Sequence, residues 1–363
     1  MKICNILLCL NPGGAENVAA KLSNIWSKQG HDVCVILFVR DDYPNFYHLD
    51  SRVKVINLDI YFKSKNFFTS IINNFKRILL IRKHFKFIKP DIIIAHCSRE
   101  ITLSYFANLF LNIKLIGYIH SNPKNITKEK SIMWKLLTYL SFSFVDHCLV
   151  FSNNSKKYLP ILAKKKSVSF LNLYTENKNM ISPNYNLKNI IIVGSFIEVK
   201  NHIIVLEVFS KILKDFPDWT LTIVGDGPLR GQYEKIITYH NIDKNVFFPG
   251  ITNDVYSYYE KASIFILPSL SEGLNLSLLE ASSFGLPCII SDCSDSHDQI
   301  ITHDKNGYIY KKNSSNELYD FIINLIKNEN LRKEFGNYAI KNSLKFSNKK
   351  TIDKWNDFLK ELH

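Results

Sequence analysis

The stretch Pro268–Asp292 reads P-S-L-S-E-G-L-N-L-S-L-L-E-A-S-S-F-G-L-P-C-I-I-S-D, and its spacing decides the fold. One apolar run, Ile264–Leu267, precedes it, and a second, Cys288–Ile290, lies near its end. This order predicts a strand, a loop, a helix and another strand, with Glu272 in the loop and Glu280 in the helix. Because open α/β sheets bind ligands at the carboxyl ends of their parallel strands, we expect the loop to line a binding site.

The start of the predicted helix, near Asn275, is suited to an anionic ligand. The first N–H groups of a helix have no partner within it, and they favour a phosphate. A carboxylate beside that position, such as Glu272, suits the hydroxyl groups of a sugar because a charged acceptor holds them well.

The whole frame resembles the Glu-x7-Glu signature of retaining nucleotide-sugar glycosyltransferases with the GT-B fold. The Pro-Ser before the first glutamate and the Gly-x-Pro and Ser-Asp after the second also match. The resemblance implies that Glu280 binds the donor ribose and that Glu272, as a catalytic residue, binds the transferred sugar. It further implies a donor-binding loop and helix start that comprise Gly273, Leu274, Asn275 and Leu276.

A second motif, Asn11–Glu16, joins the first predicted strand to the first predicted helix. Two glycines let the backbone approach a ligand closely, although such a turn is more often only a tight connection. The motif resembles the Gly-Gly-Ala-Glu start of family-four glycosyltransferases, which implies that Gly13 and Gly14 face the donor diphosphate. His120 ends a later strand, and it is either a hydrogen-bonded structural residue or, by the resemblance, a catalytic residue over the donor sugar.

The segment Val193–Asn201 resembles the family's Gly-Arg-x4-Lys segment, in which two cations neutralise the leaving diphosphate. Lys200 stands at the lysine position and is expected to be catalytic and donor-binding; a surface lysine at a helix start is the alternative. Ser195 stands at the arginine position, and losing one such group normally costs ~2.7 kcal/mol or more. Either another basic residue substitutes for the arginine, or the reaction is slow, or the match to the family segment is locally out of register.

A further match lies after V-F-F-P, at Gly250 and Ile251. In the family, backbone groups at this place hold the nucleobase, so the resemblance adds both residues to the donor site. A buried strand end followed by a turn is an equally good interpretation of the same residues.

Composition sets the broad class. The chain has 363 residues, a net charge of +13 and seven cysteines without a C-x-x-C pair. The length predicts two domains. The positive charge favours an anionic partner, or it reflects only an AT-rich genome. The cysteines indicate small buried side chains in a reducing compartment. The short apolar run after Met1 lacks a cleavage site and predicts a first strand, so we expect a cytoplasmic protein.

Alternating strand and helix patterns predict an α/β protein with two Rossmann-like, doubly wound parallel sheets that face each other across a cleft. We expect an acceptor-side domain (1–172), a linker (173–188), a nucleotide-sugar-binding domain (189–345) and a terminal helix (346–363) that, by the resemblance, packs back on the first domain. The predicted strands are Lys2–Cys9, Val33–Phe38, Val53–Leu58, Ile92–Ala95, Leu115–Ile119, His147–Phe151, Val168–Leu171, Ile190–Val193, Thr220–Val224, Val246–Phe248, Ile264–Leu267 and Cys288–Ile290.

Residues 61–90 hold eight Lys and Arg residues and no Asp or Glu. A helix from Phe67 would place Phe68, Ile71, Ile72, Phe75 and Leu79 along one apolar stripe. Such a helix fits an anionic membrane face, which would give the protein a peripheral place on the inner face of the cytoplasmic membrane. A helix packed on its sheet with a solvated basic face is the alternative.

These observations predict a retaining glycosyltransferase that moves a sugar from a nucleotide diphosphate donor, UDP-linked, to a glycan or polyprenyl- or lipid-linked acceptor in bacterial surface-polysaccharide synthesis. No metal and no cofactor are expected, because the chain has no Asp-x-Asp, H-E-x-x-H or paired-cysteine motif. The alternatives are a membrane-associated binding protein with a degenerate site, which Ser195 favours, and a nicotinamide enzyme, which the missing G-x-G-x-x-G disfavours. No nucleic-acid-binding module is visible.

Overall fold

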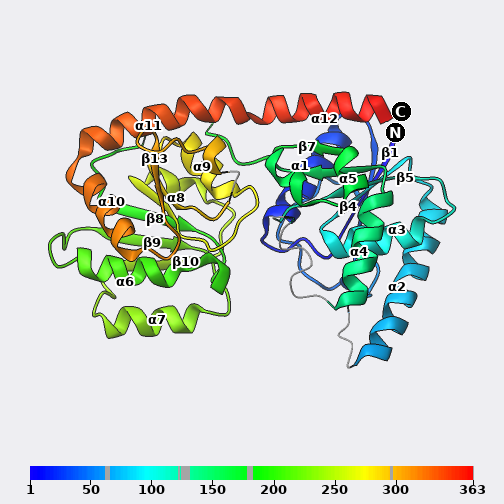
Figure 1. The fold of residues 1–363 in the computed structure, drawn as a ribbon, viewed down its shortest axis with the longest axis horizontal. Coiled ribbons are helices and arrows are strands. Elements are labelled where there is room, and N and C mark those ends of the chain that lie inside the picture. Colours follow the sequence, from blue (N-terminus) through cyan, green and yellow to red (C-terminus); the bar gives the residue numbers. More distant parts are fainter. Residues whose placement is uncertain (62–65, 122, 124–130, 178–182, 295–296, 363) are drawn as a thin grey trace. The chain divides into compact units, whose positions relative to one another are not determined.

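Two series of parallel strands with interleaved helices build the chain, as the computed structural model shows (Figure 1). The structure describes residues 1–61, 66–121, 123, 131–177, 183–294 and 297–362. These residues form two units, Met1–Leu173 and Tyr174–His363. The domain and linker bounds derived from the sequence stay predictions, as do the cleft and the return of 346–363 onto the first domain.

Unit 1 contains a seven-stranded, all-parallel sheet in the order β3-β2-β1-β4-β5-β6-β7. Its strands β1, β2 and β4 are short runs rich in Ile, Val, Leu and Cys whose side chains are mostly buried, as a sheet covered on both faces requires. The chain winds from β1 outward to β2 and β3 and then returns to β4, so the winding direction reverses between β1 and β4. The strands are β1 (Lys2–Leu7), β2 (Asp32–Leu37), β3 (Lys54–Asn57), β4 (Ile92–His96), β5 (Lys114–Tyr118), β6 (His147–Val150) and β7 (Ser167–Ser169).

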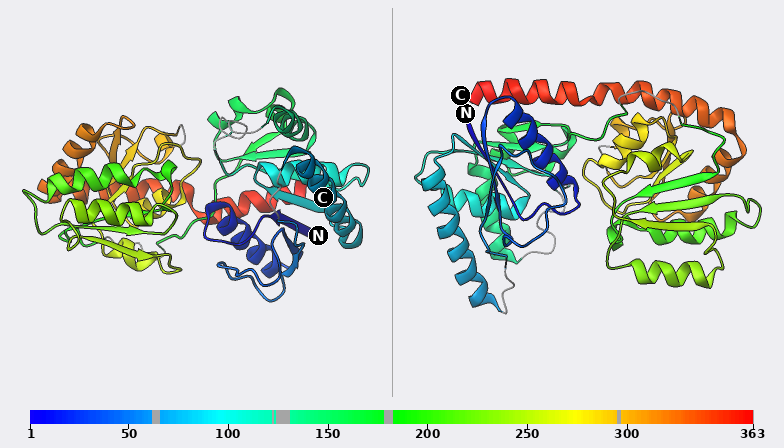
Figure 2. Two further views of the ribbon diagram at one scale, coloured as in Figure 1. Left: turned by 90° about the horizontal axis from the view of Figure 1, so that it is seen from below. Right: turned by 180° about the vertical axis from the view of Figure 1, so that it is seen from behind.

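Within the described residues of unit 1, five α-helices connect these strands. Because crossovers between parallel strands are right-handed, α1 covers one face of the sheet and the other four helices cover the opposite face. On that face α3 packs between α2 and α4, and α4 contacts α5 (Figure 2). The helices are α1 (Gly14–Lys28), α2 (Phe67–Ile88), α3 (Ser98–Asn108), α4 (Ile132–Phe144) and α5 (Ile161–Lys165).

Unit 2 contains a six-stranded, all-parallel sheet in the order β10-β9-β8-β11-β12-β13, and its winding direction reverses between β8 and β11. The helices are α6 (His202–Ile212), α7 (Arg230–Tyr239), α8 (Tyr256–Glu260), α9 (Leu276–Ser283), α10 (Ser315–Lys327), α11 (Glu329–Ser343) and α12 (Asn348–Leu362). The strands are β8 (Asn189–Val193), β9 (Thr220–Val224), β10 (Val246–Gly250), β11 (Ile264–Leu267), β12 (Cys288–Ser291) and β13 (Gly307–Tyr310).

The edge strand β13 is absent from the predicted strands. Its four residues begin with Gly307, and glycine weakens a strand pattern. In the structure this glycine lies against β12, where a Cβ atom would come within 2.1 Å of the Cys288 carbonyl oxygen. The close approach of two backbones therefore explains both the glycine and the missed strand.

The cysteines differ from expectation at two positions. Cys97 is exposed, at φ 69° between β4 and α3, and Cys293 is partly exposed. The other five are buried. No helix in the described ranges is both long enough and apolar enough to cross a bilayer.

Candidate functional site

Sheet topology brings the two predicted site loops of unit 2 together. β8 and β11 are adjacent and parallel, so their carboxyl ends lie side by side at the point where the winding direction reverses. The loop after β8 carries Lys200, and the loop after β11 carries Glu272. Residues 72 positions apart in the chain therefore face each other.

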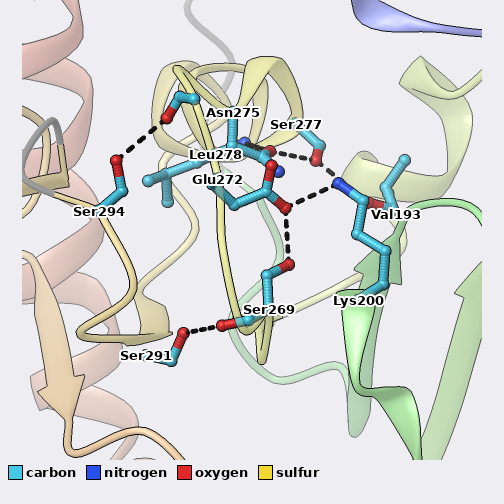
Figure 3. Close-up of polar contacts among 10 residues, drawn as sticks. Val193, Lys200, Ser269, Glu272, Asn275, Ser277, Leu278, Ser291 and Ser294 are labelled. Atoms are coloured by element: carbon cyan, nitrogen blue, oxygen red, sulfur yellow. Dashed lines mark hydrogen bonds and ion pairs between the residues drawn. The ribbon is translucent and has the colours of Figure 1, made fainter. Parts of the chain in front are cut away.

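The Lys200 ammonium donates a hydrogen bond to Glu272 Oε1 over 2.7 Å (Figure 3). The same oxygen accepts a bond from Ser269 Oγ at 2.6 Å, and the Ser269 carbonyl in turn accepts one from the Ser291 hydroxyl. The side chains of Lys200 and Glu272 are only 20% and 11% exposed. A cation and a carboxylate are thus held in fixed positions, with a small exposed area for a ligand.

The ionic state of this pair follows from its surroundings. Burial alone would raise the pKa of Glu272, but the Lys200 charge and the hydrogen bonds from Lys200 and Ser269 outweigh it and hold the pKa below its usual value. The carboxylate is therefore ionised at neutral pH. It is an acceptor for hydroxyl groups and not a proton donor.

The amino terminus of α9 lies beside the pair, as the sequence predicted. Asn275 caps the helix, because its side-chain oxygen accepts a bond from the Leu278 N–H at 3.0 Å. The Ser277 hydroxyl lies 2.6 Å from that oxygen and 3.1 Å from the Val193 carbonyl, which ties the helix start to the end of β8. The N–H groups of Leu276 and Ser277 belong to the first turn, where helix geometry supplies no acceptor.

The other predicted residues of the loop support its shape. Ser294 donates a bond to the Gly273 carbonyl, and Leu274 is buried. Gly250 ends β10 at φ 84°, and its carbonyl accepts a bond from Gly225 N, while Ile251 after it is half exposed.

Ser195 lies in the loop 194–196, which packs closely against the turn that contains Gly225 and Gly227. Gly225 has φ 141°, and a Cβ atom there would come within 2.1 Å of the Gly194 carbonyl oxygen. Gly227 is similarly close to Phe196, whose N–H donates to the Asp226 carbonyl. The Gly-Asp-Gly turn is therefore the surface on which the Ser195 loop rests.

Glu280 is buried within α9, and its hydrogen-bond partners differ from those of Lys200 and Glu272. Its two carboxylate oxygens accept bonds from the Thr175 N–H at 3.1 Å and the Tyr259 hydroxyl at 3.0 Å. These bonds fix the carboxylate, and carboxylate oxygens retain capacity for further hydroxyl donors.

In unit 1 the predicted residue His120 belongs to a buried chain of hydrogen bonds. Asn5 on β1 donates to the Ser23 hydroxyl, and its side-chain oxygen lies 3.0 Å from His96 Nε2. His96 Nδ1 lies 2.9 Å from His120 Nε2. Since the Asn5 oxygen can only accept, the proton of His96 is on Nε2, and His120 must donate from its own Nε2. His120 Nδ1 is then a bare acceptor, buried and without a partner in the described part of the chain.

We expect three buried histidines to stay neutral and to make stability depend on pH. Burial lowers the pKa of His96 and of His202 to about 3, and burial followed by the nearby His96 puts that of His120 well below its usual value. The unfolded chain binds these protons near pH 6.5, so stability is complete above that pH and falls as pH decreases below it, by up to ~1.4 kcal/mol per pH unit for each histidine.

Denaturant unfolding between pH 7.5 and 5 measures this slope. His202→Phe, which removes one of the three groups, should make the slope shallower. A free energy of unfolding that stays constant over this range would contradict the assignment of neutral, buried rings.

Gly13 already makes contacts within the protein, and its proposed role at the diphosphate stays a prediction. Gly13 has extended backbone, and a Cβ atom there would meet only the end of the Glu16 side chain. That carboxylate accepts from its own backbone N–H at the start of α1, and burial raises its pKa. A carboxyl side chain of the protein thus already lies at the helix start where the sequence predicted a phosphate, and Tyr47 bonds the backbone of Gly13.

Sequence reasoning missed several partners. Tyr259, Thr175 and Asn5 hold site residues but belong to no motif, while Ser269 belongs to the Pro-Ser of the frame although its bond to Glu272 was not anticipated. Lys312 is another, because its ammonium lies 3.5 Å from the Leu270 carbonyl, in the same loop as Glu272.

Family models match most of the chain in two parts. A model described as "Glycosyl transferases group 1" matches residues 174–342. A model described as "Glycosyltransferase Family 4" matches residues 12–161.

Similar proteins include bacterial glycosyltransferases. The chain is 26% identical to an alpha-1,4-N-acetyl-D-galactosaminyltransferase of Campylobacter jejuni, named for a PP-undecaprenol-linked substrate, over 100% of this chain and 99% of that one. It is 27% identical to an amylovoran biosynthesis glycosyltransferase of Erwinia amylovora over 96% of each.

Among solved structures, a sucrose-phosphate synthase of Thermosynechococcus elongatus aligns with a TM-score of 0.85, at 16% identity over 100% and 99% of the two chains. Anabaena HepE in complex with UDP and glucose aligns with a TM-score of 0.80, at 16% identity over 99% of each chain. At such identity, these two comparisons bear on the fold alone.

Proposed function

The chain belongs to the group 1 and family 4 glycosyltransferases and has their GT-B fold, and from this premise we propose that it moves a sugar from a UDP-linked donor with retention of configuration. The acceptor we propose is a hydroxyl of a glycan or of a polyprenyl- or lipid-linked oligosaccharide of the bacterial surface. Relatives named for amylovoran synthesis and for a PP-undecaprenol-linked glycan support this acceptor class.

One observation carries the proposal: the Lys200–Glu272 pair beside the start of α9 (Figure 3). Lys200 supplies a positive charge for a diphosphate, and the first-turn N–H groups of Leu276 and Ser277 supply donors. Glu272, ionised, accepts bonds from sugar hydroxyls. A nucleotide sugar presents these two kinds of group, diphosphate and hydroxyl, next to each other.

The chemistry we propose is a front-face substitution. The bond from the sugar C1 to the diphosphate oxygen breaks while the acceptor oxygen bonds to C1 on the same face, and the acceptor proton passes to the departing phosphate. Lys200 and the α9 terminus stabilise the charge that develops on the leaving group. We propose that the neutral His120 accepts a hydrogen bond from a ligand hydroxyl through Nδ1. The atoms that cover this buried nitrogen must first move aside.

The missing arginine at Ser195 calls for a second cation, and we propose Lys312. It approaches the loop of Glu272 from the end of β13, and its charge, like that of Lys200, acts on Cys293. Lys312 therefore lies at the carboxyl ends of the strands, as the proposed diphosphate site does.

Thermal denaturation of the whole chain with a panel of nucleotides tests the donor. UDP and UDP-sugars should raise the melting temperature, whereas GDP, ADP and NAD should not. A protein that UDP stabilises but that neither hydrolyses nor transfers any UDP-sugar would instead support the alternative, a binding protein with a degenerate site. NMR of the product's anomeric proton tests retention.

The proposed reaction needs no divalent ion, since Lys200 and helix N–H groups neutralise the diphosphate. We therefore expect transfer rates to change less than about twofold when EDTA replaces Mg²⁺ in the assay. An EDTA-inhibited enzyme that recovers with Mg²⁺ or Mn²⁺ would show that a metal takes this role.

A further inference from the structure

The outer side of α2 is apolar and faces solvent. Phe68, Ile72, Phe75 and Leu79 are 75%, 53%, 60% and 50% exposed. The helix turns other side chains toward unit 1, namely the buried Arg77, Ile81 and Phe85. The apolar stripe expected from the sequence is thus present, but it points outward, where an ordinary surface helix carries polar residues.

Two neighbouring helices repeat this pattern, which the sequence did not reveal. α4 exposes Ile132 (78%) and Leu136 (64%), and the short α5 exposes Ile161 (77%). Exposed apolar side chains on these two helices are Ile132, Met133, Leu136, Tyr139, Leu140, Phe144, Ile161 and Leu162.

The three helices belong to one face of unit 1. They connect strands that follow one another in the same direction across the sheet, so right-handed crossovers place them on the same side. α3 lies between α2 and α4, contacts both, and has no exposed residue along its length (Figure 1). We call the outward side of α2, α4 and α5 the outer face.

The outer face and the residues that flank its helices carry charge of one sign. Residues 66–90, 131–145 and 153–167 hold twelve of the chain's 46 Lys and Arg residues and none of its 33 Asp and Glu residues. The remaining chain is therefore almost neutral. Arg77 and Arg82 bond backbone carbonyls of unit 1, but eight of the lysines are exposed: Lys76, Lys83, Lys86, Lys89, Lys157, Lys164, Lys165 and Lys166.

We propose that the outer face binds the surface of an anionic lipid bilayer. Exposed aromatic and aliphatic side chains can enter the boundary between headgroups and acyl chains, while the lysines around them bond to anionic headgroups. Charge complementarity selects this occupant: because α2, α4 and α5 hold no carboxylate, the outer face repels a second copy of itself. The purpose of the contact rests on the proposed function: it brings the enzyme to a lipid-linked acceptor.

Sedimentation of the full chain with vesicles tests the proposal. Vesicles of phosphatidylcholine with 30% phosphatidylglycerol should carry the protein down at least tenfold more strongly than vesicles of phosphatidylcholine alone, and 0.5 M NaCl should weaken binding, since exposed charges are screened. Protein that remains in the supernatant with both vesicles overturns the proposal.

Substitutions locate the contact. Phe68→Ser/Phe75→Ser on α2 and Leu136→Ser/Tyr139→Ser on α4 should each lower the binding constant at least tenfold. Tyr239→Ser, at an 82% exposed site on α7 of unit 2, is the matched control and should bind as the parent does. If the α4 variant binds vesicles as strongly as the parent does, α4 does not contact the membrane.

Two further measurements distinguish membrane binding from self-association and from loss of the fold. Sedimentation equilibrium without lipid should show a monomer; a dimer that the α2 and α4 variants dissociate would make the outer face a contact between copies and overturn the proposal. The variants should keep the parent's melting temperature and its response to UDP. Vesicle binding without any UDP response would leave this inference standing while the proposed function fails.

Discussion

Replacing Lys200 with alanine is expected to lower sugar transfer by about 100- to 1000-fold, the loss that follows removal of one preorganised donor from a developing charge. Lys200 is the cation that contacts Glu272, over 2.7 Å, and in our proposal it also faces the leaving diphosphate. The Glu272 carboxylate, 11% exposed, would lose its charge partner. Breaking a buried pair by removing one member costs about 3–5 kcal/mol, and the partial exposure of Lys200 puts the expected cost toward the lower value.

A double variant separates the two effects. Lys200→Met/Glu272→Gln leaves no unpaired charge, so the melting temperature should recover toward that of the parent while transfer stays low. Glu272→Gln alone should reduce turnover at least tenfold with the fold intact. Lys188→Ala is the control, because its exposed ion pair with Asp218 is worth about 0–1 kcal/mol and lies away from the loop of Glu272.

Transfer kinetics and thermal unfolding together test the role of Lys200. Transfer by Lys200→Ala within a few-fold of the parent rate, with the cognate donor, would refute the assignment of Lys200 to the leaving group. Normal stability of Lys200→Ala would instead show that solvent readily replaces the lysine as partner of Glu272.

The second large effect is expected for Gly225→Ala, a change of one methyl group. The residue has φ 141°, a conformation that costs other residues about 1–3 kcal/mol. The new Cβ would also lie 2.1 Å from the Gly194 carbonyl oxygen, a backbone atom that cannot rotate away. Displacing the 194–196 loop adds about 1–3 kcal/mol by analogy with overpacking, so we expect destabilisation of about 2–6 kcal/mol.

Gly231→Ala is the matched control in the same region. Gly231 is the second residue of α7, and, its own chain neighbours and helix backbone aside, no described atom lies within 4 Å of the position that a Cβ would take, so alanine should stabilise the helix by at most about 0.5–1 kcal/mol. Urea unfolding of the two variants should therefore give shifts of opposite sign. If Gly225→Ala unfolds at the urea concentration of the parent, the turn is not the fixed support of the Ser195 loop.

Local patterns predicted much of the fold because strands and helices have different periods. Both sheets, the order of strand, loop and helix around Glu272, and the cap at Asn275 follow from the residues near them in the chain. The strand β13 was missed because Gly307 fits a position defined by its neighbour β12 and not by its own sequence. Cys97 was expected to be buried but is exposed, because it follows the last strand residue.

The candidate site was predictable only in part. Motif spacing identified Lys200, Glu272 and the start of α9, and the structure brings these together in one unit. Motif spacing did not identify Tyr259 or Thr175 as partners of Glu280, and it included Ser269 without indicating its bond to Glu272. The role of Gly13 and Gly14 stays a prediction, with Glu16 as an unforeseen competitor for the same helix terminus.

The sequence alone determined the family, the two parallel sheets and the positions of both glutamates, since each depends on residues close together in the chain. Only the tertiary structure decided which side chains meet: Lys200 with Glu272, and Asn5 with His96 and His120. It also decided that the apolar stripe of α2 faces outward and continues on α4 and α5. Which side chains meet depends on which strands are adjacent, and which stripe is exposed depends on what packs against the helix. Both depend on contacts between segments far apart in the chain.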